Sequence, residues 1–115
     1  MGHITTDLIK DAWRELKVAD NLIDAGQTYA GVMKCENALR DLSRSSETVS
    51  EGVWFTGQEN SLRKDIGQLK RTPEPSAEDV RDLVTETRRL VKKTRERVVP
   101  IINDRLDYET SARLS

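Results

Sequence analysis

The chain has 115 residues, which suits one domain, and its formal net charge of −1 favours neither nucleic acid nor an anionic membrane as a whole. Hydrophobic residues make up 36% and charged residues 34%, so we expect a thin core that gains from burial against a second chain. Cys35 is the only cysteine, which excludes an intrachain disulfide, and no apolar run approaches the ~20 residues of a membrane span. We therefore expect a cytoplasmic protein without a membrane span.

The first predicted helix covers about residues 6–25. Thr6 followed by Asp7 is typical of a helix start, and Gly26 is typical of the residue that closes one. Apolar residues recur at alternating spacings of three and four, which predicts one face buried in a bundle. These residues are Ile9, Ala12, Leu16, Ala19 and Ile23, with Leu8 and Trp13 widening the stripe.

A second helix is predicted over residues 28–46. The connection at Gly26-Gln27 is short, so we expect the first two helices to be antiparallel neighbours. The apolar residues of the second helix keep the same spacing, at Val32, Cys35, Leu39 and Leu42.

Residues 43–57 lose the helical period and hold four serines and two glycines, which predicts a loop. This loop carries Trp54 and Phe55 side by side, two of the five aromatic residues in the chain. Thr56 and Glu59 form a T-x-x-E capping box, so a third helix is predicted over residues 57–71.

The sequence TPEPS at residues 72–76 is the strongest break in the chain, and Ser76 is a good N-cap for a fourth helix over 77–110. Pro100 interrupts this helix and either kinks it or splits off a final segment. At 1.5 Å per residue the whole helix is ~50 Å long. Part of it must then project beyond the other helices or pack on a second copy.

These patterns predict an all-α fold, most simply an antiparallel four-helix bundle with a long, Pro-interrupted C-terminal helix. One domain covers residues 1–115, and no internal repeat or strand-like alternation is evident.

The residue types needed for most catalytic sites are missing. His3 is the only histidine and lies near the N-terminus, which argues against a zinc site or a Ser-His-Asp arrangement. Calcium-loop and phosphate-loop spacings are absent as well. Cys35 lies on an apolar stripe, where a buried structural cysteine is the favoured interpretation. We expect no enzyme activity, no catalytic residue, no cofactor and no metal.

The clearest charged feature is the segment 88–97, in which six basic residues stand against one acid. At ~100° per residue, four basic positions fall within about 60° of one another beside the apolar stripe. We call these four the basic ridge: Arg81, Arg88, Lys92 and Arg95.

Three interpretations of the basic ridge remain open. It follows phosphates or anionic headgroups, although no aromatic residue is interleaved in this segment for base stacking. It binds an acidic protein partner in a related interpretation. Alternatively it is a solvated or salt-bridged surface that faces an acidic ridge on the first helix and fixes the order of helices or the orientation of chains. We favour this last interpretation, with Asp7, Asp11 and Glu15 as the acidic ridge.

Two apolar pairs are candidates for partner contacts. Trp54 and Phe55 form either a staple that caps the bundle or an exposed anchor, since Trp is favoured at interface hot spots. Val18 and Leu22 lie off the core stripe, which indicates either incidental exposure or a second contact face.

Together these observations favour a non-enzymatic helical protein–protein interaction module, acting as an adaptor, regulator or assembly subunit. We expect it to associate with itself, with a dimer favoured, or with another protein. Its expected contact residues are Trp54, Phe55, Val18 and Leu22, with the basic ridge giving electrostatic orientation. The alternative is a small nucleic-acid-associated regulator that uses the basic ridge.

Overall fold

The structure is a computed structural model of the chain. It describes the backbone of residues 2–47 and 56–114 and the side chains of residues 7–45 and 57–97. Within this part the fold is entirely helical, so the predicted all-α class is confirmed.

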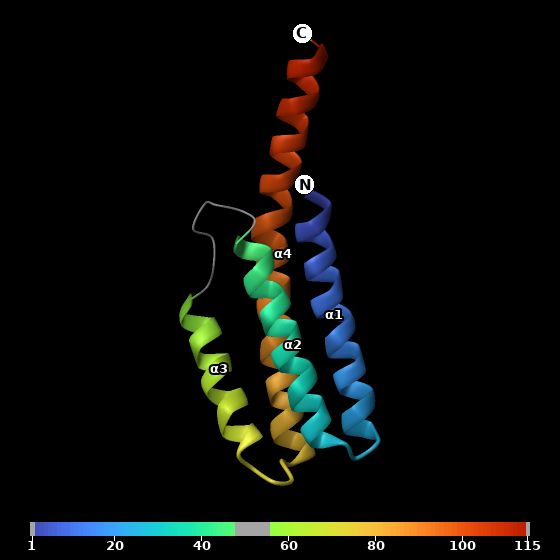
Figure 1. Ribbon diagram of the computed structural model, residues 1–115, viewed down its shortest axis with the longest axis vertical. Coiled ribbons are helices and arrows are strands. Elements are labelled where there is room, and N and C mark those ends of the chain that lie inside the picture. Colours follow the sequence, from blue (N-terminus) through green and yellow to red (C-terminus); the bar gives the residue numbers. More distant parts are fainter. Residues whose placement is uncertain (1, 48–55, 115) are drawn as a thin grey trace.

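Four α-helices make up the fold (Figure 1). They are α1 (Gly2–Asp24), α2 (Thr28–Glu47), α3 (Thr56–Lys70) and α4 (Ala77–Leu114). Helices α1, α2 and α4 pack against one another, and α3 packs against α2 and α4. The structure is long and narrow because α4 continues beyond the ends of the others, giving extents of 60 × 26 × 16 Å (Figure 1).

The core consists of the apolar stripes that the sequence predicts. Every member of the α1 stripe from Ile9 to Ile23 is at most 5% exposed, and Val32, Cys35, Leu39 and Leu42 are buried on α2. On α4 the stripe includes Thr87 and Thr94, whose hydroxyls donate to the carbonyl oxygens of Leu83 and Leu90. These helix-internal bonds satisfy both hydroxyls, so the two threonines are buried without an unpaired polar group.

The turn between α1 and α2 is closed by Gly26, whose φ of 81° lies in the left-handed region. The Gly26 N–H donates to the Ile23 carbonyl, and the Gln27 N–H donates to the Leu22 carbonyl. This bond pair is the Schellman motif, so the predicted glycine cap is confirmed. At the start of α4 the Asp79 N–H donates to Ser76 Oγ at 3.1 Å, which confirms Ser76 as the N-cap.

Gly31 brings α2 close to its neighbours. A Cβ atom at this position would lie 3.1 Å from Ile23 Cγ1 and 3.2 Å from Val80 Cγ1. Sequence reasoning gave Gly31 no role, because a glycine inside a helix is visible in a sequence but its packing partners are not.

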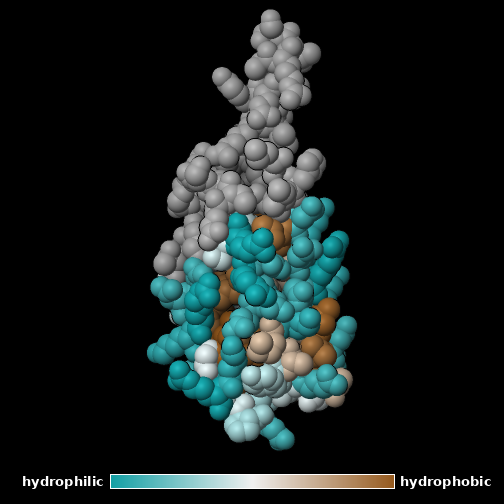
Figure 2. Space-filling model, viewed as in Figure 1, coloured by the Kyte–Doolittle hydropathy of each residue, from teal (hydrophilic) through white to brown (hydrophobic). Residues whose placement is uncertain are grey.

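Among the coloured residues in Figure 2, the visible side of the molecule is mostly hydrophilic, and hydrophobic side chains reach it only in small patches. Among the described residues, no helix is both long enough and apolar enough to cross a membrane.

Candidate functional site

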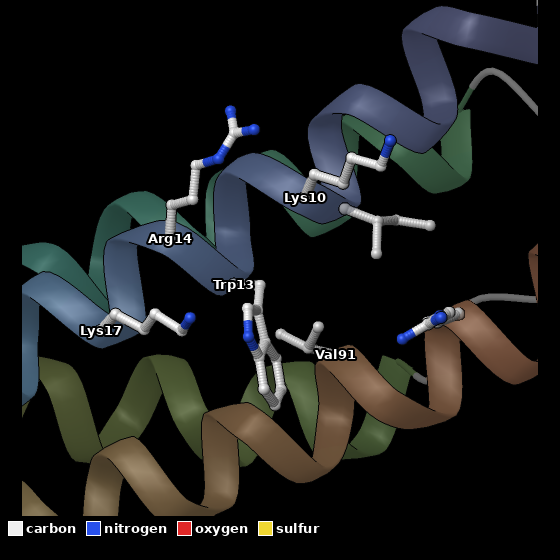
Figure 3. Close-up of a pocket in the computed structure, with 7 residues that line it drawn as sticks. Lys10, Trp13, Arg14, Lys17 and Val91 are labelled. Atoms are coloured by element: carbon white, nitrogen blue, oxygen red, sulfur yellow. The ribbon is translucent and has the colours of Figure 1, made fainter.

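Trp13 is the largest exposed apolar side chain among the described residues, with 43% of its surface exposed. It follows Ala12 of the core stripe, and neighbouring residues in an α-helix are rotated by about 100°, so Trp13 lies beside the buried face on the side toward α4. Figure 3 shows its indole ring reaching from α1 toward α4 and lying beside Val91. Sequence reasoning placed Trp13 in the widened core stripe, and the exposed fraction shows that this placement was wrong.

A hollow of about 400 Å³ lies beside this ring, between α1 and α4. Its apolar floor comes from Ile9 and Val91, which are almost fully buried, and from the indole itself. Its rim is cationic throughout, because the other lining residues are Lys10, Arg14, Lys17 and Arg95 (Figure 3).

Arg88 covers one face of Trp13. Its guanidinium carbon lies 5.7 Å from the ring centroid, within the range of a cation–π contact. The same guanidinium also donates to a carboxylate oxygen of Asp20 on α1. A second hollow shares Trp13, Val91 and Arg95 with the first, so the indole stands between two basic recesses.

Two basic rows frame Trp13, one from each helix. Lys10, Arg14 and Lys17 on α1 are spaced i, i+4, i+7, and so are Arg88, Lys92 and Arg95 on α4. At 1.5 Å per residue each row runs ~10 Å along its helix. We call the hollows, their aromatic centre and the two rows the Trp13 groove.

Only part of this positive charge is neutralised within the bundle. Arg14 pairs with Asp11 at 3.3 Å, and Arg88 pairs with Asp20. Among the described residues no carboxylate lies within ion-pair distance of Lys10, Lys17, Lys92 or Arg95. Several like charges thus surround one apolar recess, an arrangement that favours an anionic or acidic occupant.

The structure divides the basic ridge in two. Arg81 pairs with Asp24 at 3.2 Å and Arg88 with Asp20, so this half of the ridge joins α4 to α1. Lys92 and Arg95 instead line the recesses beside Trp13. The aromatic group that the segment 88–97 lacks is therefore supplied by another helix.

Acids of α1 do pair with the basic ridge, but they are Asp20 and Asp24 and not the predicted acidic ridge. Glu15 of the acidic ridge lies 3.5 Å from Lys34 on α2, not beside α4. Burial, together with the nearby carboxylates of Asp11 and Glu15, raises the pKa of Asp41 on α2. The acidic ridge therefore faces α2, because it lies on the other flank of the α1 stripe from Trp13.

The predicted apolar contact residues do not join the Trp13 groove. Val18 is 42% exposed and Leu22 is half-buried, so they form a separate patch on α1. At 100° per residue both lie on the same flank as the acidic ridge. Trp54 and Phe55 lie outside the described residues.

Cys35 is fully buried, as the sequence predicts. Burial raises the pKa of its thiol to about 12, and the carboxylate of Asp20 adds to the shift. A thiol with this pKa is almost entirely protonated at neutral pH and is a poor nucleophile or metal ligand. Among the described residues, no three His, Cys, Asp or Glu side chains are grouped as a metal site would require.

One signal in the sequence could have identified the groove. Trp13 is preceded by Lys10 at i−3 and followed by Lys17 at i+4, so both lysines lie beside it on any helix.

Comparisons with family models, with curated proteins and with solved structures found no match to this chain.

Proposed function

We propose that this chain is a non-enzymatic helical interaction module that binds a protein partner through the Trp13 groove. The observation that supports this proposal is the exposed indole of Trp13 between two basic rows. Trp and Arg are the residue types most enriched at interface hot spots, where an apolar anchor is surrounded by a polar rim. The groove has this composition, with Trp13 and Val91 at its centre and cations around them.

The chemistry of the groove suits binding better than catalysis. Its lining residues are lysine, arginine and apolar side chains, with one threonine in the second recess. No lining residue is a carboxylate, histidine or cysteine that would act as a general base or nucleophile at neutral pH.

The finer parts of the expected fold and setting belong to the same proposal. These are the antiparallel order of the helices, a kink at Pro100 within α4, the cytoplasmic location and the role as adaptor, regulator or assembly subunit. The patch of Val18 and Leu22 and the pair Trp54 and Phe55 are secondary contact candidates. Binding at the Trp13 groove does not depend on them.

Site-specific photocrosslinking tests the proposal in cells. A photoreactive amino acid replaces Lys17, which lines the groove, or Lys64, which is exposed on α3 and serves as the matched control. We expect a protein adduct when the photoreactive residue is at position 17, and a lower yield or no adduct when it is at position 64. Trp13→Ala should remove the adduct while helix content is retained. Equal labelling from both positions would contradict the proposal.

Nucleic acid is a second candidate, and one observation favours it. Trp13 supplies an aromatic surface beside Lys92 and Arg95, which is the combination that single-stranded nucleic acid requires. Against it, Arg88 already covers one face of the indole, and the overall charge is −1. Titration with a fluorescent single-stranded oligonucleotide separates the two. Binding that weakens steeply with salt and is lost in a Lys92→Glu, Arg95→Glu variant would establish this candidate.

A further inference from the structure

We propose that the partner in the Trp13 groove is the C-terminal part of α4 from a second copy of this chain, arranged as an antiparallel dimer. This inference rests on the proposed function and names its partner. The α4 basic row is the first part of a longer repeat along this helix. The α4 basic row at 88, 92 and 95 continues at spacings of four and three to 99, 102, 106 and 109.

The continuation changes from basic to apolar. Positions 99, 102 and 106 are Val99, Ile102 and Leu106, and position 109 is Glu109. A 3,4 repeat of this kind is the pattern by which one helix packs along another. One flank of α4 therefore carries a cationic half followed by an apolar half that ends in an acid.

The last part of α4 extends beyond the other described helices (Figure 1). Figure 1 shows the C-terminal part of α4 continuing past the N-terminal end of α1, with no other described helix beside this last part. A single amphipathic helix is marginal in water and gains its stability from burying its apolar side. A second chain is the simplest source of that burial.

Charge selects the antiparallel arrangement. Residues 88–97 hold six basic residues and one acid, whereas residues 103–110 hold three acids and one basic residue. A parallel pair would place like segments side by side, and an antiparallel pair places each basic segment against an acidic one. The contact is then the same on both copies, as a closed two-fold dimer requires.

The repeat also sets the register. The midpoint of its six positions from 92 to 109 falls between 99 and 102, so in the proposed pairing Val99 faces Ile102 of the second copy. One step of the repeat further out, Arg95 faces Leu106 of the second copy. Two steps further out, Lys92 faces Glu109 of the second copy. Arg95 lines both recesses, so this register brings a leucine to the apolar floor beside Trp13 and a carboxylate to Lys92. The leucine side chain matches the apolar floor of the groove, and the carboxylate matches its cationic rim.

Molar mass by light scattering across a concentration series tests the association. We expect a dimer for the full chain and a monomer for Leu106→Asp. Ser111→Asp, which adds the same charge outside the repeat, should remain dimeric. Lys92→Glu and Glu109→Lys should each weaken the dimer by about tenfold, and the double variant should recover it. A full chain that stays monomeric, or a double variant weaker than both single ones, would overturn the inference.

A designed disulfide tests the register. Positions 92 and 109 are ~25 Å apart along one helix, so cysteines placed there cannot join within a chain, whose limit is ~7 Å between Cα atoms. In a Cys35→Ala background, Lys92→Cys with Glu109→Cys should give a covalent dimer on mild oxidation. Lys93→Cys with Glu109→Cys should not, because Lys93 lies toward α3. A dimer that links equally through both pairs would refute this register.

The two proposals fail separately. A monomeric chain that still gives a Trp13-dependent adduct with a different protein would overturn the dimer and retain the interaction module. A chain that dimerises normally when Trp13 is replaced by alanine would overturn the groove as the contact surface. An adduct of twice the chain mass from position 17, lost in Leu106→Asp, supports both.

Discussion

Arg88 and Trp13 connect the two parts of the α1–α4 contact. The Arg88 guanidinium lies 5.7 Å from the Trp13 ring centroid and also pairs with Asp20, which lies about two turns further along α1. Toward the start of α4 the contact is ionic, with Arg81 on Asp24. On the other side of Arg88 it becomes the open, cationic Trp13 groove. One residue therefore marks the boundary between a contact that holds the bundle together and a surface left for a partner.

Arg88→Ala should destabilise the fold by about 1 kcal/mol, since a half-exposed ion pair and a cation–π contact are both lost. Arg89→Ala is the matched control, because Arg89 pairs only with Glu86 on its own helix among the described residues. Urea unfolding of both variants checks the difference. Equal losses would show that the contact between Arg88 and α1 contributes little.

Gly31→Ala and Gly67→Ala should shift stability in opposite directions. A Cβ at Gly31 meets two side-chain carbons at close to 3 Å, so overpacking should cost about 1–3 kcal/mol. At Gly67 no atom lies within 4 Å of the new Cβ, so the better helix propensity of alanine should add about 0.5–1 kcal/mol. Thermal unfolding measures both. A stabilised Gly31→Ala variant would show that α1 and α4 move apart easily.

Asp41→Asn should stabilise the fold at neutral pH and lose this advantage in acid. The pKa of Asp41 is raised in the folded state by burial and by neighbouring carboxylates. A raised carboxyl pKa means that the charged form is disfavoured by folding, so the penalty grows as the pH rises through the carboxyl range. The side chain is partly exposed, so we expect at most about 0.5 kcal/mol.

Unfolding free energies of Asp41→Asn and wild type, measured from pH 3 to pH 7, check this sign. The two curves should converge at the acid end. A constant offset across this range would mean that packing, not charge, separates the two side chains.

Cys35 should be inert to thiol reagents in the folded protein and fully reactive after denaturation, because it is buried and its pKa is raised to about 12. Its folded pKa exceeds the unfolded value, so its contribution to stability is present below the unfolded pKa and is lost as the pH rises toward 12. Cys35→Ala should therefore flatten the alkaline decline in stability. Rapid labelling under native conditions would show that α2 opens locally.

The helices and their buried sides could be read from the sequence, because each depends on local pattern. The stripe from Ile9 to Ile23 repeats at three and four, and one helical face collects these residues whatever packs on it. Gly26 and Ser76 mark helix ends through bonds to residues within the adjoining turn. The sequence also indicates correctly that Cys35 is buried.

Only the tertiary structure shows which helix contacts each flank of an apolar stripe. A stripe has two flanks, and the order of helices around the bundle determines which flank meets which helix. In this fold one flank of α1 brings Trp13, Asp20 and Asp24 to α4, and the other brings Glu15 to α2. The reverse order around the bundle would bury the same stripes and exchange these flanks. Burial of the core is insensitive to that choice, so the apolar pattern predicts the helices while the Trp13 groove appears only once they are packed.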